Sequence, residues 1–207
     1  MRLMVYGQLS PQVNFFIETD NPKFGLANNY GGDSFIQDAY VEYVASDAFQ
    51  LDMGMILVPF SHQSMQSATS LATLDYQSST IKYPAGHKVW RDMGVMARGL
   101  VAGDKLEYRL GVFNGAHGDA TPMAVAGVDD TGTAITYFQA THARNPDDLP
   151  RFMGRLTINA FEAEGGAGVG GFYYDGVYLK KKDKGIVSPK KVLSIGLAAD
   201  IQPGHNV

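Results

Sequence analysis

The chain has 207 residues, with 17 basic against 21 acidic side chains and a formal charge of −4, so nothing in its charge indicates a nucleic-acid-binding protein. It has no cysteine, which excludes disulfides, thiolate catalysis and cysteine-based zinc sites. No apolar run approaches the roughly 18 residues of a transmembrane helix, whereas membrane-spanning strands need only about 9–11 residues each.

Apolar and polar side chains alternate with period two over much of the chain, which predicts β-strands. In residues 105–113, for example, every second side chain is apolar: Leu106, Tyr108, Leu110 and Val112. About nine strands are expected, which in chain order are residues 3–9, 12–19, 34–44, 48–58, 91–101, 105–113, 151–161, 172–181 and 190–201. The expected fold class is therefore all-β and antiparallel.

The connections between these strands alternate in length. Short ones at 10–11, 45–47 and 102–104 are separated by long ones at 20–33, 59–91 and 114–150. This asymmetry is typical of an up-and-down outer-membrane β-barrel, which has short periplasmic turns and long outer loops. An odd number of strands does not close a single-chain bacterial barrel. We therefore expect residues 1–207 to be one incomplete barrel domain without its signal peptide and its C-terminal strands.

The alternative is a secreted β-sandwich, such as a carbohydrate-binding module that presents Trp90, Tyr173 and Tyr174 as exposed aromatic residues. The two folds differ in one observable feature. A barrel exposes its apolar strand faces to lipid, so Leu106, Tyr108, Leu110 and Val112 would lie on the outside of a curved sheet, whereas a sandwich would bury them.

The sequence resembles the outer-membrane phosphate-selective porins, the family of porins O and P. The resemblance rests on GQLSPQVNFFIETD at 7–20, RDMG at 91–94 and YRLGVFNG at 108–115, together with residues 38–40, 54–61 and 178–196. These stretches occur in family order over nearly the whole chain. The resemblance implies a transmembrane β-barrel of about sixteen strands, of which about nine would be present here. It also implies a homotrimer in the bacterial outer membrane, in contact with lipid and lipopolysaccharide, that lets small anions or other small solutes diffuse through.

Residues 59–91 occupy the place of the porin loop that folds inward and narrows the pore. The loop has a single acidic residue, Asp75, and His62 is a further possible donor. Cations at a narrow passage lower the barrier for anions because their charges act at short range. The pore-constriction candidates are Lys82, His87, Lys88 and Arg91. The alternative is an ordinary solvated loop.

The polar strand faces predict the lumen wall. Its basic candidates are Arg98, Lys105, Arg109, Arg151 and Arg155, with Arg2 at the first strand. A similar number of acidic residues shares these faces, namely Glu18, Asp38, Glu42, Asp52, Asp92 and Glu107. Because the two signs balance, the wall itself predicts no selectivity, and phosphate specificity does not follow from it.

Other polar groups carry weaker signals. The histidines show no spacing typical of metal ligands, and no Ser-His-acid arrangement is apparent, so neither a metal, a cofactor nor an enzyme is expected. The paired aspartates at 129–130 and 147–148 and the glycine run at 165–171 are interpreted as turns. The basic cluster of residues 180–182, 184 and 190–191 is expected at the outer rim, where it either contacts lipopolysaccharide phosphates or forms a solvated hairpin.

Overall fold

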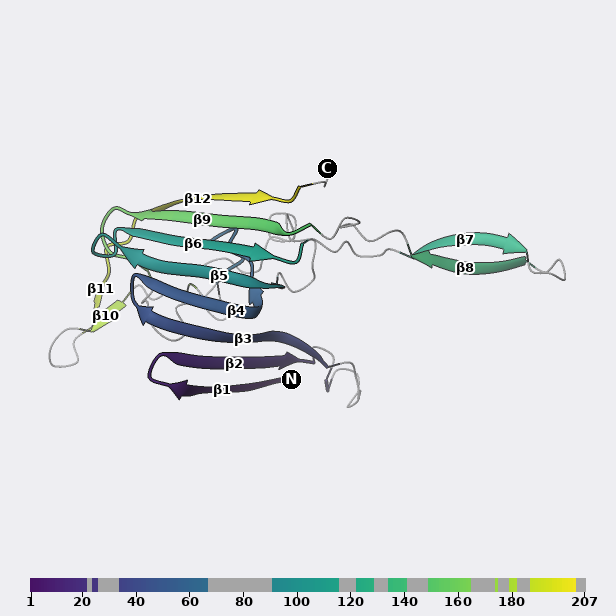
Figure 1. The fold of residues 1–207 in the computed structure, drawn as a ribbon, viewed down its shortest axis with the longest axis horizontal. Coiled ribbons are helices and arrows are strands. Elements are labelled where there is room, and N and C mark those ends of the chain that lie inside the picture. Colours follow the sequence, from purple (N-terminus) through teal and green to yellow (C-terminus); the bar gives the residue numbers. More distant parts are fainter. Residues whose placement is uncertain are drawn as a thin grey trace.

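In the computed structural model, residues 1–21, 24–25, 34–66, 91–115, 122–128, 134–140, 149–164, 174, 179–181 and 187–203 are described. Eight strands form one antiparallel sheet in the order β1-β2-β3-β4-β5-β6-β9-β12 (Figure 1). They are β1 (Arg2–Ser10), β2 (Val13–Asp20), β3 (Phe35–Ser46), β4 (Phe49–Leu57), β5 (Arg91–Val101), β6 (Leu106–Phe113), β9 (Arg151–Asn159) and β12 (Ser194–Ile201). Within the described part of the chain, no helix is long and apolar enough to cross a membrane.

The up-and-down order predicted from the turns is confirmed. Each of β1 to β6 pairs with the next strand along the chain, and β6 then pairs with β9. The short turns after β1, β3 and β5 all lie at the same ends of the strands, called here the turn end of the sheet (Figure 1). The connections from β2 to β3, from β4 to β5 and from β6 to β9 all begin at the opposite strand ends, called here the loop end.

Two parts of the predicted strand assignment are wrong. The connection 114–150 contains a hairpin of β7 (Pro122–Val128) and β8 (Ala134–Ala140), which projects beyond the loop end in Figure 1. Its first strand is rich in alanine and glycine, so period two gave no signal there. The described residues of the predicted strand 172–181 do not join the main sheet. They are Tyr174, which forms an isolated bridge with Gln66, and β10 (Leu179–Lys181), which pairs with β11 (Val187–Pro189) in a separate hairpin.

Because β12 pairs directly with β9 in antiparallel fashion, the connection 160–193 starts and ends at the turn end. Its two ends run side by side there, where the Ala160 amide donates to the Leu193 carbonyl at 2.9 Å and the Glu162 amide donates to the Lys191 carbonyl at 2.9 Å. The turn end therefore carries one long connection beside three short turns. The described lysines of the basic cluster, which include Lys190 and Lys191, lie at this end with the short turns and not at the end with the long connections, where the outer rim was predicted.

One face of the sheet is apolar and exposed. Leu110 is 53% exposed and Val112 is 44% exposed, while Leu106 and Tyr108 on the same face are half-buried. Neighbouring strands continue this exposed apolar face with Val41, Met53, Val95, Phe152, Leu156, Ile158, Ile195 and Leu197. A β-sandwich would cover such a face with a second sheet, so the sandwich alternative is wrong and the outward apolar face of a barrel is confirmed.

The other face is the inner wall, and its loop end is covered by the chain itself. Ile56 on β4, Met96 on β5, Phe113 on β6 and Met153 on β9 point to this face and are almost fully buried. They form one cluster with Val58 and with Met65, which is 0% exposed. The start of the β4–β5 connection, residues 58–66, therefore packs on the inner wall, and we call it the inward segment.

Candidate functional site

The inner wall carries three arginines in register across adjacent strands. Arg98 on β5 lies directly opposite Arg109 on β6, and Arg109 lies directly opposite Arg155 on β9. Adjacent strands are about 4.8 Å apart, so this arginine row crosses roughly 10 Å of wall. Like charges placed directly opposite each other destabilise a sheet unless other groups compensate. The row is therefore a costly arrangement whose charges need partners.

Arg98 is compensated by acids on β3 and β4. Its Nε donates to Asp52 at 2.8 Å, and its Nη2 donates to Glu42. Asn14 on β2 also donates to Glu42, at 3.0 Å. Glu42 and Asp52 lie directly opposite each other, so Arg98 also removes the repulsion between these two carboxylates.

Other wall arginines are paired in the same way. Arg109 donates from Nε to Glu107 at 2.6 Å. Arg151 binds Asp200 on β12 through two parallel hydrogen bonds of 2.7 and 2.5 Å. Such bidentate pairs fix both position and orientation of the guanidinium. Arg2, at the edge strand β1, contacts Glu18 at 2.8 Å.

The pore-constriction candidates are only partly within the described residues. Lys82, His87 and Lys88 lie outside them. Arg91 begins β5 and is buried, and its Nε and Nη2 each donate to Asp38 at 3.0 Å. The charge of Arg91 is thus matched by a buried carboxylate rather than offered to the lumen.

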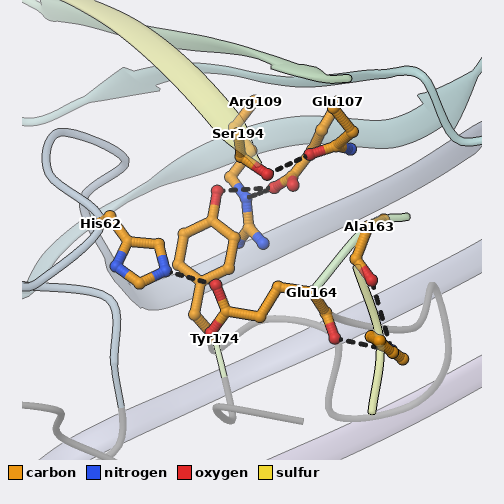
Figure 2. Close-up of polar contacts among 9 residues, drawn as sticks. His62, Glu107, Arg109, Ala163, Glu164, Tyr174 and Ser194 are labelled. Atoms are coloured by element: carbon orange, nitrogen blue, oxygen red, sulfur yellow. Dashed lines mark hydrogen bonds and ion pairs between the residues drawn. The ribbon is translucent and has the colours of Figure 1, made fainter. Parts of the chain in front are cut away.

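Two residues from the turn-end connection, Tyr174 and Glu164, hold the inward segment (Figure 2). The Tyr174 amide donates to the Met65 carbonyl at 2.9 Å, and the Tyr174 ring stacks on His62 with 4.5 Å between centroids. His62 Nε2 lies 2.5 Å from Glu164, and Tyr174 Oη donates to Glu107 on the wall at 2.9 Å. Tyr174 therefore connects the inward segment to β6, although the two chain segments enter from opposite ends of the sheet.

Two of the basic wall candidates have no carboxylate partner among the described residues. Lys105 lies at the turn end and donates to the carbonyls of Ala160 and Phe161, so it braces the connection rather than lining the wall. Arg155 donates from Nη1 to the Phe60 carbonyl at 2.9 Å, and its guanidinium lies 5.9 Å from the Tyr174 ring centroid. Arg155 is therefore the member of the arginine row whose charge is not matched by an acid in the described part of the chain.

A pocket of about 220 Å³ opens beside Arg155 at the turn end of the wall. Its lining includes Thr157, Glu107, Glu164, His62 and Tyr174. We call it the side pocket. Its position follows from the register, because Thr157 lies directly opposite Glu107 on one neighbouring strand and Gly196 on the other. Among the described residues, no group of three or more histidine and acidic side chains is arranged to hold a metal ion.

Sequence reasoning missed three members of this site. Asp200 is an even number of residues from Ser194 and Gly196 on β12, so the three lie on the same face. The alternation of side chains along a strand was therefore sufficient to place Asp200 on the inner wall. Tyr174 was expected as an exposed aromatic residue only in the β-sandwich alternative, and Glu164 was not among the candidates. No local pattern identifies either one, because their partners His62 and Glu107 are far away in sequence.

Comparison with known proteins adds one finding. The family model described as phosphate-selective porin O and P matches residues 1–205. Neither the curated proteins nor the solved structures give a match to the chain.

Proposed function

Because the chain belongs to the phosphate-selective porin O and P family, whose members are porins of the bacterial outer membrane, we propose that it lets small hydrophilic solutes diffuse passively, with a preference for anions. The exposed apolar face then contacts lipid and the inner wall faces water. Porins are channels rather than enzymes. As in the family resemblance, the assembly we propose is a homotrimer.

The observation that carries the anion preference is the arginine row on the inner wall. Arg98, Arg109 and Arg155 stay charged at all physiological pH values because guanidinium does not deprotonate in proteins. Charges that line a narrow passage act on a passing ion at short range, before salt can screen them.

The ion pairs limit how strong this preference is. Three carboxylates, Glu42, Asp52 and Glu107, pair with Arg98 and Arg109 and balance the three positive charges of the row, so any preference for anions comes from the local field at Arg155 and not from a net charge. We therefore propose selectivity for anions as a class and not for phosphate alone.

Lys82, His87 and Lys88 add to this filter in the proposal, because the chain between the inward segment and β5 has only one acidic residue. The support is indirect. The inward segment lies on the inner wall, where Met65 is completely buried, and the lysines follow it along the chain.

Charge reversal tests the proposed filter. Replacing both Lys82→Glu and Lys88→Glu in the full-length protein is expected to move the reversal potential in planar bilayers toward cation preference under a salt gradient. The shift is expected to shrink as ionic strength rises above about 0.1 M, where the screening length falls below about 10 Å. The matched control is the same reversal at the turn end, Lys190→Glu with Lys191→Glu. An equal shift in that control would show that Lys82 and Lys88 have no specific role in the selectivity of the channel.

A further inference from the structure

We propose that the side pocket is a binding subsite for small anions that also carry a hydroxyl group, such as hydrogen phosphate or a short hydroxycarboxylate. The inference deepens the proposed function, because it assumes that the inner wall faces a solute pathway. It concerns the chemistry of one place on that wall and does not involve the loop lysines.

Two buried donors in the pocket have no partner in the described part of the chain. Arg155 Nε and Thr157 Oγ1 are both buried without a hydrogen bond, and Thr157 is only 4% exposed. A buried polar group that lacks a partner costs about 1–3 kcal/mol in general, so such groups are rare without a reason. The two donors lie two residues apart on one strand and thus point to the same face, about 7 Å apart along β9. A small oxyanion bound between them is large enough to accept a hydrogen bond from each of the two donors.

The neighbouring strand β12 leaves space for the Arg155 guanidinium. Gly196 on β12 faces the inner wall, and a Cβ at this position would collide with the Arg155 guanidinium, with Cζ only 2.7 Å away. The Phe60 carbonyl and the Tyr174 ring hold the same guanidinium from the lumen side. Gly196 therefore leaves room for the Arg155 guanidinium, and the Phe60 carbonyl and the Tyr174 ring hold it at the pocket, where it has no carboxylate partner among the described residues.

The acids in the pocket define which anions fit. Glu107 lies directly opposite Thr157, and the two hydrogen bonds that it accepts from described side chains, those of Arg109 and Tyr174, end on Oε1. This leaves Oε2 to accept a further bond. A bare anion such as chloride or sulfate would meet this carboxylate as a like charge. An anion with a hydroxyl group can accept from Arg155 and Thr157 while it donates to Glu107, which turns repulsion into a hydrogen bond.

The size of the pocket sets an upper limit on the ligand. At about 220 Å³ it is smaller than the roughly 300–1,000 Å³ of pockets for drug-sized molecules, so a solute of a few non-hydrogen atoms fits. His62 of the inward segment is part of the pocket lining, and its side chain is 38% exposed.

The test compares anions that differ by one hydroxyl group. Single-channel conductance of the full-length protein is measured against concentration for glycolate and acetate, and for hydrogen phosphate and sulfate, each corrected for free mobility. We expect glycolate and hydrogen phosphate to half-saturate the conductance at concentrations about tenfold lower than their counterparts, as one charge-assisted hydrogen bond implies.

Two variants locate the effect. Thr157→Val removes a hydroxyl with no partner and keeps the shape, so folding is not at risk. We expect it to raise the half-saturating concentration of glycolate about fivefold, as loss of one ordinary hydrogen bond implies. Arg155→Gln is expected to raise it for all four anions. Lys191→Gln removes the same charge from an exposed side chain outside the pocket and is expected to change none of them.

Equal half-saturation for glycolate and acetate, or no effect of Thr157→Val, would overturn the subsite. If the wild-type channel in either case still prefers anions in a potassium chloride gradient, the proposed function stands and only this inference fails. A protein that forms no channel in bilayers would overturn both.

Discussion

Removing the Tyr174 hydroxyl tests whether this residue pins the inward segment to the wall. Tyr174→Phe keeps the ring, its stacking on His62 and its position near the Arg109 guanidinium, which lies 5.0 Å from the ring centroid. It removes the hydrogen bond from Oη to Glu107, which measures 2.9 Å. The change therefore tests the hydrogen bond by which Tyr174 joins the inward segment to β6.

The expected size follows from the kind of bond. A hydrogen bond to a charged acceptor contributes about 1.5–3 kcal/mol in general, and the partial exposure of the Glu107 side chain, 14%, favours the lower end. A loss of about 1.5 kcal/mol raises the ratio of released to pinned segment about tenfold. Single-channel recording detects this, because a segment that leaves the wall changes the width of the passage. The pinned and released states then give two conductance levels. We expect about a tenfold rise in the ratio of time spent at the level of the released state to time spent at the level of the pinned state.

The chain offers a matched control for the same chemical change. Tyr108 Oη donates to the Ala48 carbonyl at 2.8 Å, but this bond lies on the outward face and not on the inner wall. Tyr108→Phe is expected to leave the conductance levels as they are. If Tyr174→Phe has the same recordings as the wild type, or if Tyr108→Phe changes them equally, Tyr174 does not position the inward segment.

Two further predictions concern the wall and the lipid face. Asp200→Ala leaves the buried Arg151 without its bidentate partner and is expected to destabilise the protein by about 3–5 kcal/mol. This is measured as a lower urea midpoint in lipid vesicles, and Asp47→Ala in an exposed turn is the control expected to change stability by less than about 0.5 kcal/mol. Leu110→Arg places a charge on the exposed apolar face and is expected to cost about 2–4 kcal/mol of folding into a bilayer if that position is near the midplane. A variant that inserts as well as Leu110→Phe would show that this face does not meet lipid.

The sequence was sufficient for the local geometry of the sheet. Period two in residues 105–113 placed Leu110 outward and Arg109 inward, as the structure has them. The short turn at 102–104 also determines a register, because Val101 opposite Leu106 places Arg98 opposite Arg109. One of the two pairings in the arginine row, that of Arg98 with Arg109, was therefore already determined by one hairpin.

Long-range register was not determined by the sequence. Arg155 lies opposite Arg109 only because β9 joins the sheet after a long connection that contains a hairpin of its own. The same limit applies to Tyr174, which reaches Met65 from the other end of the sheet. Such contacts depend on how loops return to the wall, and loops with many glycine and lysine residues carry no periodic signal for this. The prediction of a strand at 172–181 was wrong for the same reason, since this segment belongs to such a loop.

The central claim is that the inner wall of this sheet lines a water-filled pore that favours anions. The most direct test is the reversal potential of the full-length wild-type protein in planar bilayers, with potassium chloride at about 0.1 M on one side and a tenfold excess on the other. We predict stable channels with a reversal potential of the sign that chloride permeation produces, and a smaller potential when both concentrations are raised. Channels that favour potassium, or the absence of channels, would contradict the account.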